Sequence, residues 1–106
     1  MPDESRNHGV QPLDAIMNAW SITNHRLVEE SFEQLNHKQI QKARKGRQLT
    51  LHLRMKIARQ LNETILQQLT EENRPGFQPY LHKHLFQYAK GHDPEWQDPN
   101  QSLFPQ

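Results

Sequence analysis

Eight lysine and arginine residues fall within residues 34–62, and this stretch contains no aspartate or glutamate. The chain has thirteen basic residues in 106, so most of its positive charge lies in about a quarter of its length. The segments on either side carry six acidic residues each, and the net charge of +1 therefore hides a strong separation of charge. Because a local excess of positive charge attracts polyanions, this stretch favours a nucleic acid as the partner.

The residues suited to contacting a duplex lie in and after a short helix predicted for residues 37–45. Glutamine can pair with adenine and lysine with the acceptors of guanine, whereas cations outside the groove hold phosphates. The exposed positions expected to contact bases are His37, Lys38, Gln39, Gln41 and Lys42. The positions expected to contact phosphates are Arg44, Lys45, Arg47 and Arg54. The basic stretch holds no Phe, Tyr or Trp for stacking on unpaired bases, so double-stranded DNA is favoured over a single strand.

The sequence contains few residue patterns typical of an enzyme active site or a metal site. The chain has no cysteine, which excludes disulfides, thiolate nucleophiles and thiolate metal ligands. It also lacks a glycine-rich phosphate loop and a His-Glu-x-x-His helix. His82 and His84 stand near His92 and Asp93, but residues two apart on a helix point in different directions. We therefore expect no enzyme activity, no metal or other cofactor, and no small-molecule ligand.

Helices are the elements expected to position the basic residues. Hydrophobic residues make up only 33% of the chain, and a helix needs to bury just one apolar stripe. Helical spacing predicts a first helix over residues 13–20, with Trp20 in the core. A second helix is expected after a cap at Thr23 or Asn24, with Leu27, Val28, Ser31 and Phe32 on its inner face.

The next helices follow from their caps and apolar repeats. Asn36 is expected to cap the helix of residues 37–45, and Gly46 to end it in a left-handed conformation. Thr50 is expected to start a longer helix that ends near residue 72, before a turn at residues 73–76. A short helix is expected after Pro79. Together these elements predict an all-α fold, a small four- to five-helix bundle with a helix-turn-helix core and flexible termini.

The run Leu35-Asn36-His37-Lys38-Gln39-Ile40-Gln41-Lys42-Ala43-Arg44-Lys45-Gly46-Arg47, followed by Thr50 and by Lys56 to Asn62, resembles a known family. It is similar to the latter part of phage lambda repressor-like (XRE-type) helix-turn-helix domains, over about residues 13–65. The resemblance implies that Asn36 is the cap, Ile40 the buried anchor, and His37, Lys38, Gln39 and Gln41 the base-contacting positions. It also places Arg47 in a phosphate-contacting loop. From Leu27 to Ile40 the chain runs longer than the family spacing.

The domain organisation expected from these patterns has four parts. Residues 1–12 form a disordered tail, residues 13–72 the helix-turn-helix-like domain, and residues 92–106 a proline-rich tail. Residues 73–91 form a short helix that packs on the core or mediates a homodimer, with residues 77–90 as the candidate interface. No apolar run is long enough for a signal sequence or a membrane span, so we expect a soluble, cytoplasmic protein without membrane contact.

The sequence predicts a DNA-binding protein, a transcriptional regulator whose helix at residues 37–45 enters the major groove. Two alternatives stay open. The first is an adaptor module whose basic helix binds an acidic protein partner. The second is an RNA-binding protein, because RNA would match the same charge pattern.

Overall fold

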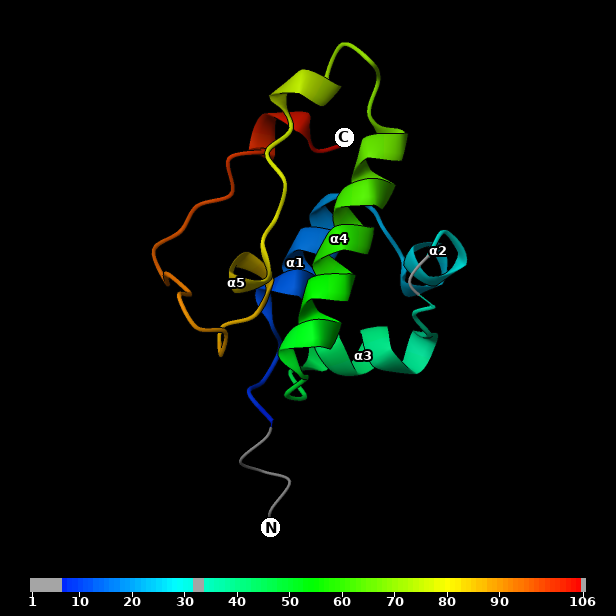
Figure 1. Ribbon diagram of the computed structural model, residues 1–106. Helices are drawn as coiled ribbons and strands as arrows, with labels where there is room; N and C mark the ends of the chain where they lie inside the picture. Colours follow the sequence, from blue (N-terminus) through cyan, green and yellow to red (C-terminus); the bar gives the residue numbers. More distant parts are fainter. Residues whose placement is uncertain (1–6, 32–33, 106) are drawn as a thin grey trace.

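The computed structural model describes residues 7–31 and 34–105, and it confirms the all-α class. Two single 3-10 turns, Arg74–Gly76 and Gln101–Leu103, accompany the α-helices. Within the described residues, no helix is long and apolar enough to cross a membrane. The five α-helices (Figure 1) are α1 Pro12–Ala19, α2 Asn24–Glu29, α3 His37–Lys45, α4 Leu51–Gln68 and α5 His82–Leu85.

The ends of the short helices match the capping residues of the sequence. Thr23 caps α2 by accepting a hydrogen bond from the Arg26 amide. At α3, the Asn36 side chain accepts from the Gln39 amide at 2.8 Å, and the Gln39 side chain accepts from the Asn36 amide at 3.0 Å. Gly46 ends α3 at φ +103°, as predicted. Thr50 caps α4 in the same way as Thr23 caps α2.

Two helices are shorter than expected. Helix α2 has six residues, and just beyond it Gln60 donates to the Glu30 carbonyl at 3.1 Å. Helix α4 ends at Gln68 rather than near residue 72. The Gln68 side chain donates to the Trp20 carbonyl at 3.0 Å, and the backbone turns extended at residue 69. Phe32, expected on the inner face of the second helix, lies outside the described residues.

The core gathers the apolar stripes of α1, α3, α4 and α5. Its fully buried apolar side chains come from residues 13 to 86, so the core unites segments far apart in sequence. The largest of them are Trp20, Tyr80, Phe86, Leu13, Met17, Leu27, Ile40, Ile57, Leu61, Ile65 and Leu85. Helix α3 lies across one end of the long helix α4 (Figure 1). It contributes only Ile40 and Ala43 to the core.

Residues 7–11 are ordered, which corrects the expectation of a disordered tail for that part of the N-terminus. The His8 amide donates to the Gly46 carbonyl at 2.8 Å, and the Gln11 amide donates to the Arg44 carbonyl at 3.0 Å. Gln11 is only 1% exposed, and its side chain accepts from the Gln87 amide at 2.7 Å. The free carbonyls at the end of α3 need donors, and the N-terminal segment supplies them.

The C-terminal segment also packs on the core. The Trp20 indole donates to the Tyr80 hydroxyl at 2.9 Å, and this hydroxyl donates to Asp98. Burial and the bond to Asp98 raise the pKa of Tyr80 far above its usual range, so the hydroxyl stays protonated. The fully buried Asn100 holds both backbone groups of Gln78, with bonds of 2.8 and 2.9 Å. The segment expected as a proline-rich tail therefore follows a defined path from α5 back toward α1.

Candidate nucleic-acid interface

The outer face of α3 carries a continuous polar stripe. Lys38, Gln41, Lys42 and Lys45 stand at positions i, i+3, i+4 and i+7, which share one face of a helix. All four are exposed, whereas Ile40 and Ala43 on the opposite face are fully buried. We call these four residues the α3 stripe. Three cations and one amide therefore point into solvent from nine residues of helix.

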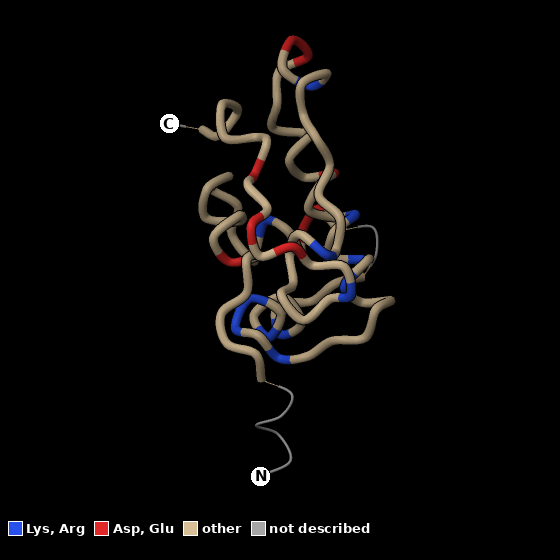
Figure 2. The backbone as a smooth tube through the Cα atoms, turned by 90° about the vertical axis from the view of Figure 1, so that its left-hand side faces the viewer, with Lys and Arg blue, Asp and Glu red and all other residues tan. Residues whose placement is uncertain are grey.

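The three carboxylates that precede α3 in the described residues are engaged on α1 and at the end of α2. Asp14 is paired with Arg44, and Glu30 with Arg26. Glu29 lies 3.2 Å from the His25 ring. None of the three lysines of the α3 stripe pairs with a carboxylate of the described residues. Figure 2 shows Lys and Arg gathered at the end of the molecule from which the N-terminus leaves, with most Asp and Glu beyond them.

The first turn of α3 holds the other two candidates for base contacts. His37 is exposed, and its ring stacks on that of His25 with 5.5 Å between the ring centroids. One of their ring nitrogens donates to the other across 3.3 Å. Gln39 is half-buried, and its carbonyl oxygen is engaged in the cap with Asn36. Gln39 therefore lies at the flank of the helix, away from the centre of the α3 stripe.

Arg44, which was expected to contact phosphate, has partners within the protein. Its side chain is only 16% exposed. The guanidinium donates to Asp14 at 2.7 Å, to Asn24 at 2.6 Å and to Asn18 at 2.9 Å. One cation therefore joins α1, α2 and α3, and it is held on the inner side of α3. Sequence reasoning missed this role because the partners stand 20 to 30 residues away.

The other arginines expected to contact phosphate lie beyond the end of α3. Arg47 is half-buried, and its backbone forms an isolated bridge with Asn7. Arg54 is also half-buried, with its guanidinium 5.2 Å from the centre of the Tyr88 ring. Within the expected phosphate set, Lys45 is exposed, whereas Arg47 and Arg54 are half-buried.

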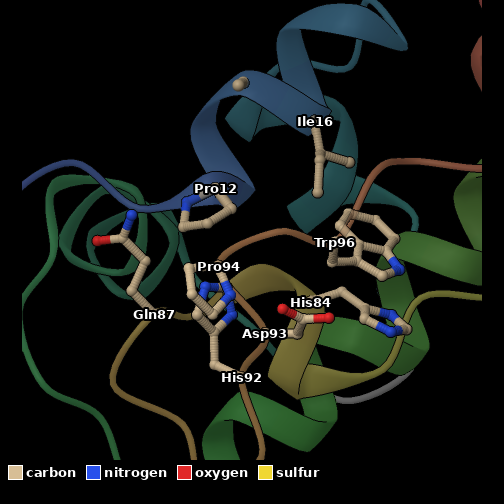
Figure 3. Close-up of a pocket in the computed structure, with 9 residues that line it drawn as sticks. Pro12, Ile16, His84, Gln87, His92, Asp93, Pro94 and Trp96 are labelled. Atoms are coloured by element: carbon tan, nitrogen blue, oxygen red, sulfur yellow. The ribbon is translucent and has the colours of Figure 1, made fainter.

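A cavity of about 400 Å³ lies on another part of the molecule, between α1, α5 and the C-terminal segment (Figure 3). Its wall includes His84, which stacks on Trp96 with 4.4 Å between the ring centroids. The His92 ring makes a hydrogen bond of 2.7 Å to the Lys83 carbonyl. Among the described residues, no three His, Asp or Glu side chains are grouped so as to hold a metal ion. The His84 ring therefore has an aromatic partner within the protein, and the His92 ring has a backbone partner.

The chain matches no protein-family model, no curated protein and no solved structure. The chemistry of the α3 stripe therefore has to be interpreted from its own geometry.

Proposed function

We propose that this protein binds double-stranded DNA through the α3 stripe, as a helix-turn-helix transcriptional regulator. The observation that carries the proposal is the exposed run of Lys38, Gln41, Lys42 and Lys45 on one face of a helix capped at both ends. A helix with this face fits the major groove, where lysine and glutamine can meet base edges. The resemblance to the lambda repressor-like family that we infer for residues 13–65 would imply the same function.

The composition of the stripe favours DNA over an acidic protein. Protein interfaces depend on a few buried aromatic or aliphatic anchors, and the α3 stripe contains none. Interfaces with DNA are instead polar and strongly positive. A duplex is the DNA form that fits, because no aromatic residue stands among residues 34–62 for stacking on unpaired bases.

The roles that we propose within the site take the exposure of each side chain into account. Lys38, Gln41 and Lys42 stand at the centre of the exposed face and are proposed to contact bases, with His37 at its start. Lys45 and Arg47 are proposed to contact phosphates. Residues 77–90 were a candidate homodimer interface, but their Phe77, Tyr80, Leu85, Phe86 and Ala89 side chains are buried in the core. We therefore propose no dimer through those side chains.

The test is a fluorescence-anisotropy titration of the protein with a random duplex at several salt concentrations. We expect affinity that falls steeply with salt, since each phosphate contact releases counterions. The double variant Lys38→Ala/Lys42→Ala should weaken binding at least tenfold. Its control, Lys83→Ala/Lys90→Ala, removes the same charge from the α5 region and should change affinity less than threefold. Equal losses in both variants would show that only net charge matters.

A second arm separates base contacts from phosphate contacts. Once selection from a random pool has given a preferred site, Gln41→Ala should weaken binding to that site more than to random duplex. Lys45→Ala should weaken both equally and reduce the salt slope by about one unit. Absence of duplex binding at low salt would overturn the proposal.

A further inference from the structure

A groove of about 220 Å³ runs between α4 and the extended segment before α5. Met55, Ala58 and Asn62 form its wall on α4, and Pro79 and Leu81 form the opposite wall. Helix α4 and this segment approach each other where both line the groove (Figure 1). The groove opens on α4, whereas the α3 stripe stands on a different helix. We call this feature the α4 groove.

Exposed apolar side chains gather at the α4 groove. The described residues leave only four large apolar side chains exposed, and two of them, Met55 at 42% and Leu81 at 52%, line the groove. A third, Leu51 at 51%, stands one helical turn before Met55 on the same face of α4. An exposed apolar patch with a polar border marks a surface for another molecule.

The two walls of the groove are tied to each other. The Asn62 side chain donates to the Tyr80 carbonyl at 2.9 Å and accepts from the Tyr80 amide at 2.8 Å. Tyr80 is in turn anchored by its buried hydroxyl to Trp20 and Asp98. The groove therefore exists before any partner binds, and binding does not have to order its walls.

Positive charge borders the α4 groove. The exposed Arg59 lines the groove on α4. Burial lowers the pKa of His82, which also lines the groove, and the nearby cations Arg54 and Lys83 lower it further. Helix α4 carries no carboxylate before Glu63, which follows Asn62. In a symmetric dimer through this groove, the positive borders of the two copies would face each other. Repulsion between these like charges opposes such a contact. Nucleic acid would leave the exposed Met55 and Leu81 against charged phosphates.

We propose that the α4 groove binds an acidic amphipathic segment of a partner protein. One or two large apolar side chains of this segment insert between Met55 and Leu81, and carboxylates on either side of them meet the bordering cations. The segment fits as a short helix, whose apolar residues recur every three or four positions. A regulator bound to DNA through α3 would keep this groove available for such a partner.

The experiment uses a labelled synthetic peptide with leucines on one helical face and glutamates elsewhere, titrated against the full chain by fluorescence anisotropy. We expect saturable binding that is lost when the glutamates are replaced by lysine or the leucines by serine. Met55→Ser/Leu81→Ser should weaken binding at least tenfold. The control Val10→Ser changes an exposed apolar side chain elsewhere and should leave affinity within twofold.

Three outcomes would overturn the proposal. The first is absence of saturable binding by the acidic peptide, and the second is equal affinity of both variants. The third is self-association of the unmodified chain in sedimentation that Met55→Ser/Leu81→Ser abolishes, which would assign the groove to a second copy. Duplex binding by the groove variant should stay within twofold of the unmodified chain, so failure here is distinguishable from failure of the DNA-binding proposal.

Discussion

Arg44 of α3 and Asp14 of α1 form an ion pair, with 2.7 Å between Nε and Oδ1. The same guanidinium also donates to Asn18 and Asn24, so one side chain holds three helices at fixed positions. Because α3 buries only Ile40 and Ala43, apolar packing alone gives it little attachment to the core. The polar contacts of Arg44 therefore help to orient the α3 stripe toward solvent.

Arg44→Ala should lower the free energy of unfolding by about 2 kcal/mol, because hydrogen bonds to a charged and largely buried group are lost. Lys45→Ala, one residue along, should change it by less than about 0.5 kcal/mol. Urea unfolding followed by circular dichroism measures both. Under conditions where Arg44→Ala is fully folded, its duplex affinity should fall less than that of Lys38→Ala. A larger fall would return Arg44 to the phosphate-contacting set.

Gly46→Ala should be among the most destabilising single substitutions in the described chain. Gly46 has φ +103°, and an added Cβ would lie 1.7 Å from the carbonyl oxygen of Gly9. The backbone conformation alone costs about 1–2 kcal/mol, and relief of the clash must detach residues 7–11 from the end of α3. Gly76→Ala is the matched control, since its Cβ would meet no atom within 4 Å. Similar unfolding midpoints for the two variants would contradict the close approach of Gly9 to Gly46.

Tyr80→Phe should lower the free energy of unfolding by about 1–3 kcal/mol, because it leaves the buried Trp20 indole and Asp98 without their shared partner. The control is Tyr88→Phe, which removes a half-buried hydroxyl that accepts from the Leu49 amide at 3.0 Å. In this variant the Leu49 amide can donate to water instead, so Tyr88→Phe should lower the free energy of unfolding by less. Thermal unfolding followed by tryptophan fluorescence compares the two, and a larger loss in the control would contradict the assigned network.

Stability should fall as the pH drops through the range in which histidine titrates. Burial and nearby cations lower the pKa of His82 and of His84 below the ordinary value of 6.5. The unfolded chain therefore takes up these protons first as the pH falls, which favours unfolding until the folded-state pKa is reached. Urea unfolding at pH values of about 7.5 and about 5.5 measures the change across the usual histidine range.

His84→Asn provides the control for this pH dependence. An Asn carbonyl oxygen can still accept from the Leu81 amide, which donates to the His84 ring at 3.0 Å in the native chain. The variant loses one titrating group, so its stability should fall less between the two pH values. An unchanged difference would show that the pKa of His84 does not contribute.

The local structure of α3 followed from the sequence because its causes are local. Asn36 and Gly46 set its two ends, and the i, i+3, i+4, i+7 spacing of the α3 stripe is already present in the chain. The ends of α2 and α4 could not be derived in this way. Near these ends, the side chains of Gln60 and Gln68 reach backbone carbonyls 30 and 48 residues away.

By itself, the sequence determined an all-helical chain with its positive charge concentrated in residues 34–62, because helical periodicity, caps and charge are properties of neighbouring residues. Only the tertiary structure decided which cations face solvent: Lys38 and Lys42 do, whereas Arg44 turns inward to Asp14. It also decided that residues 7–11 lie against Gly46 and that Met55 and Leu81 share one groove. These contacts join segments that are distant in the sequence, so they form only when the whole chain packs.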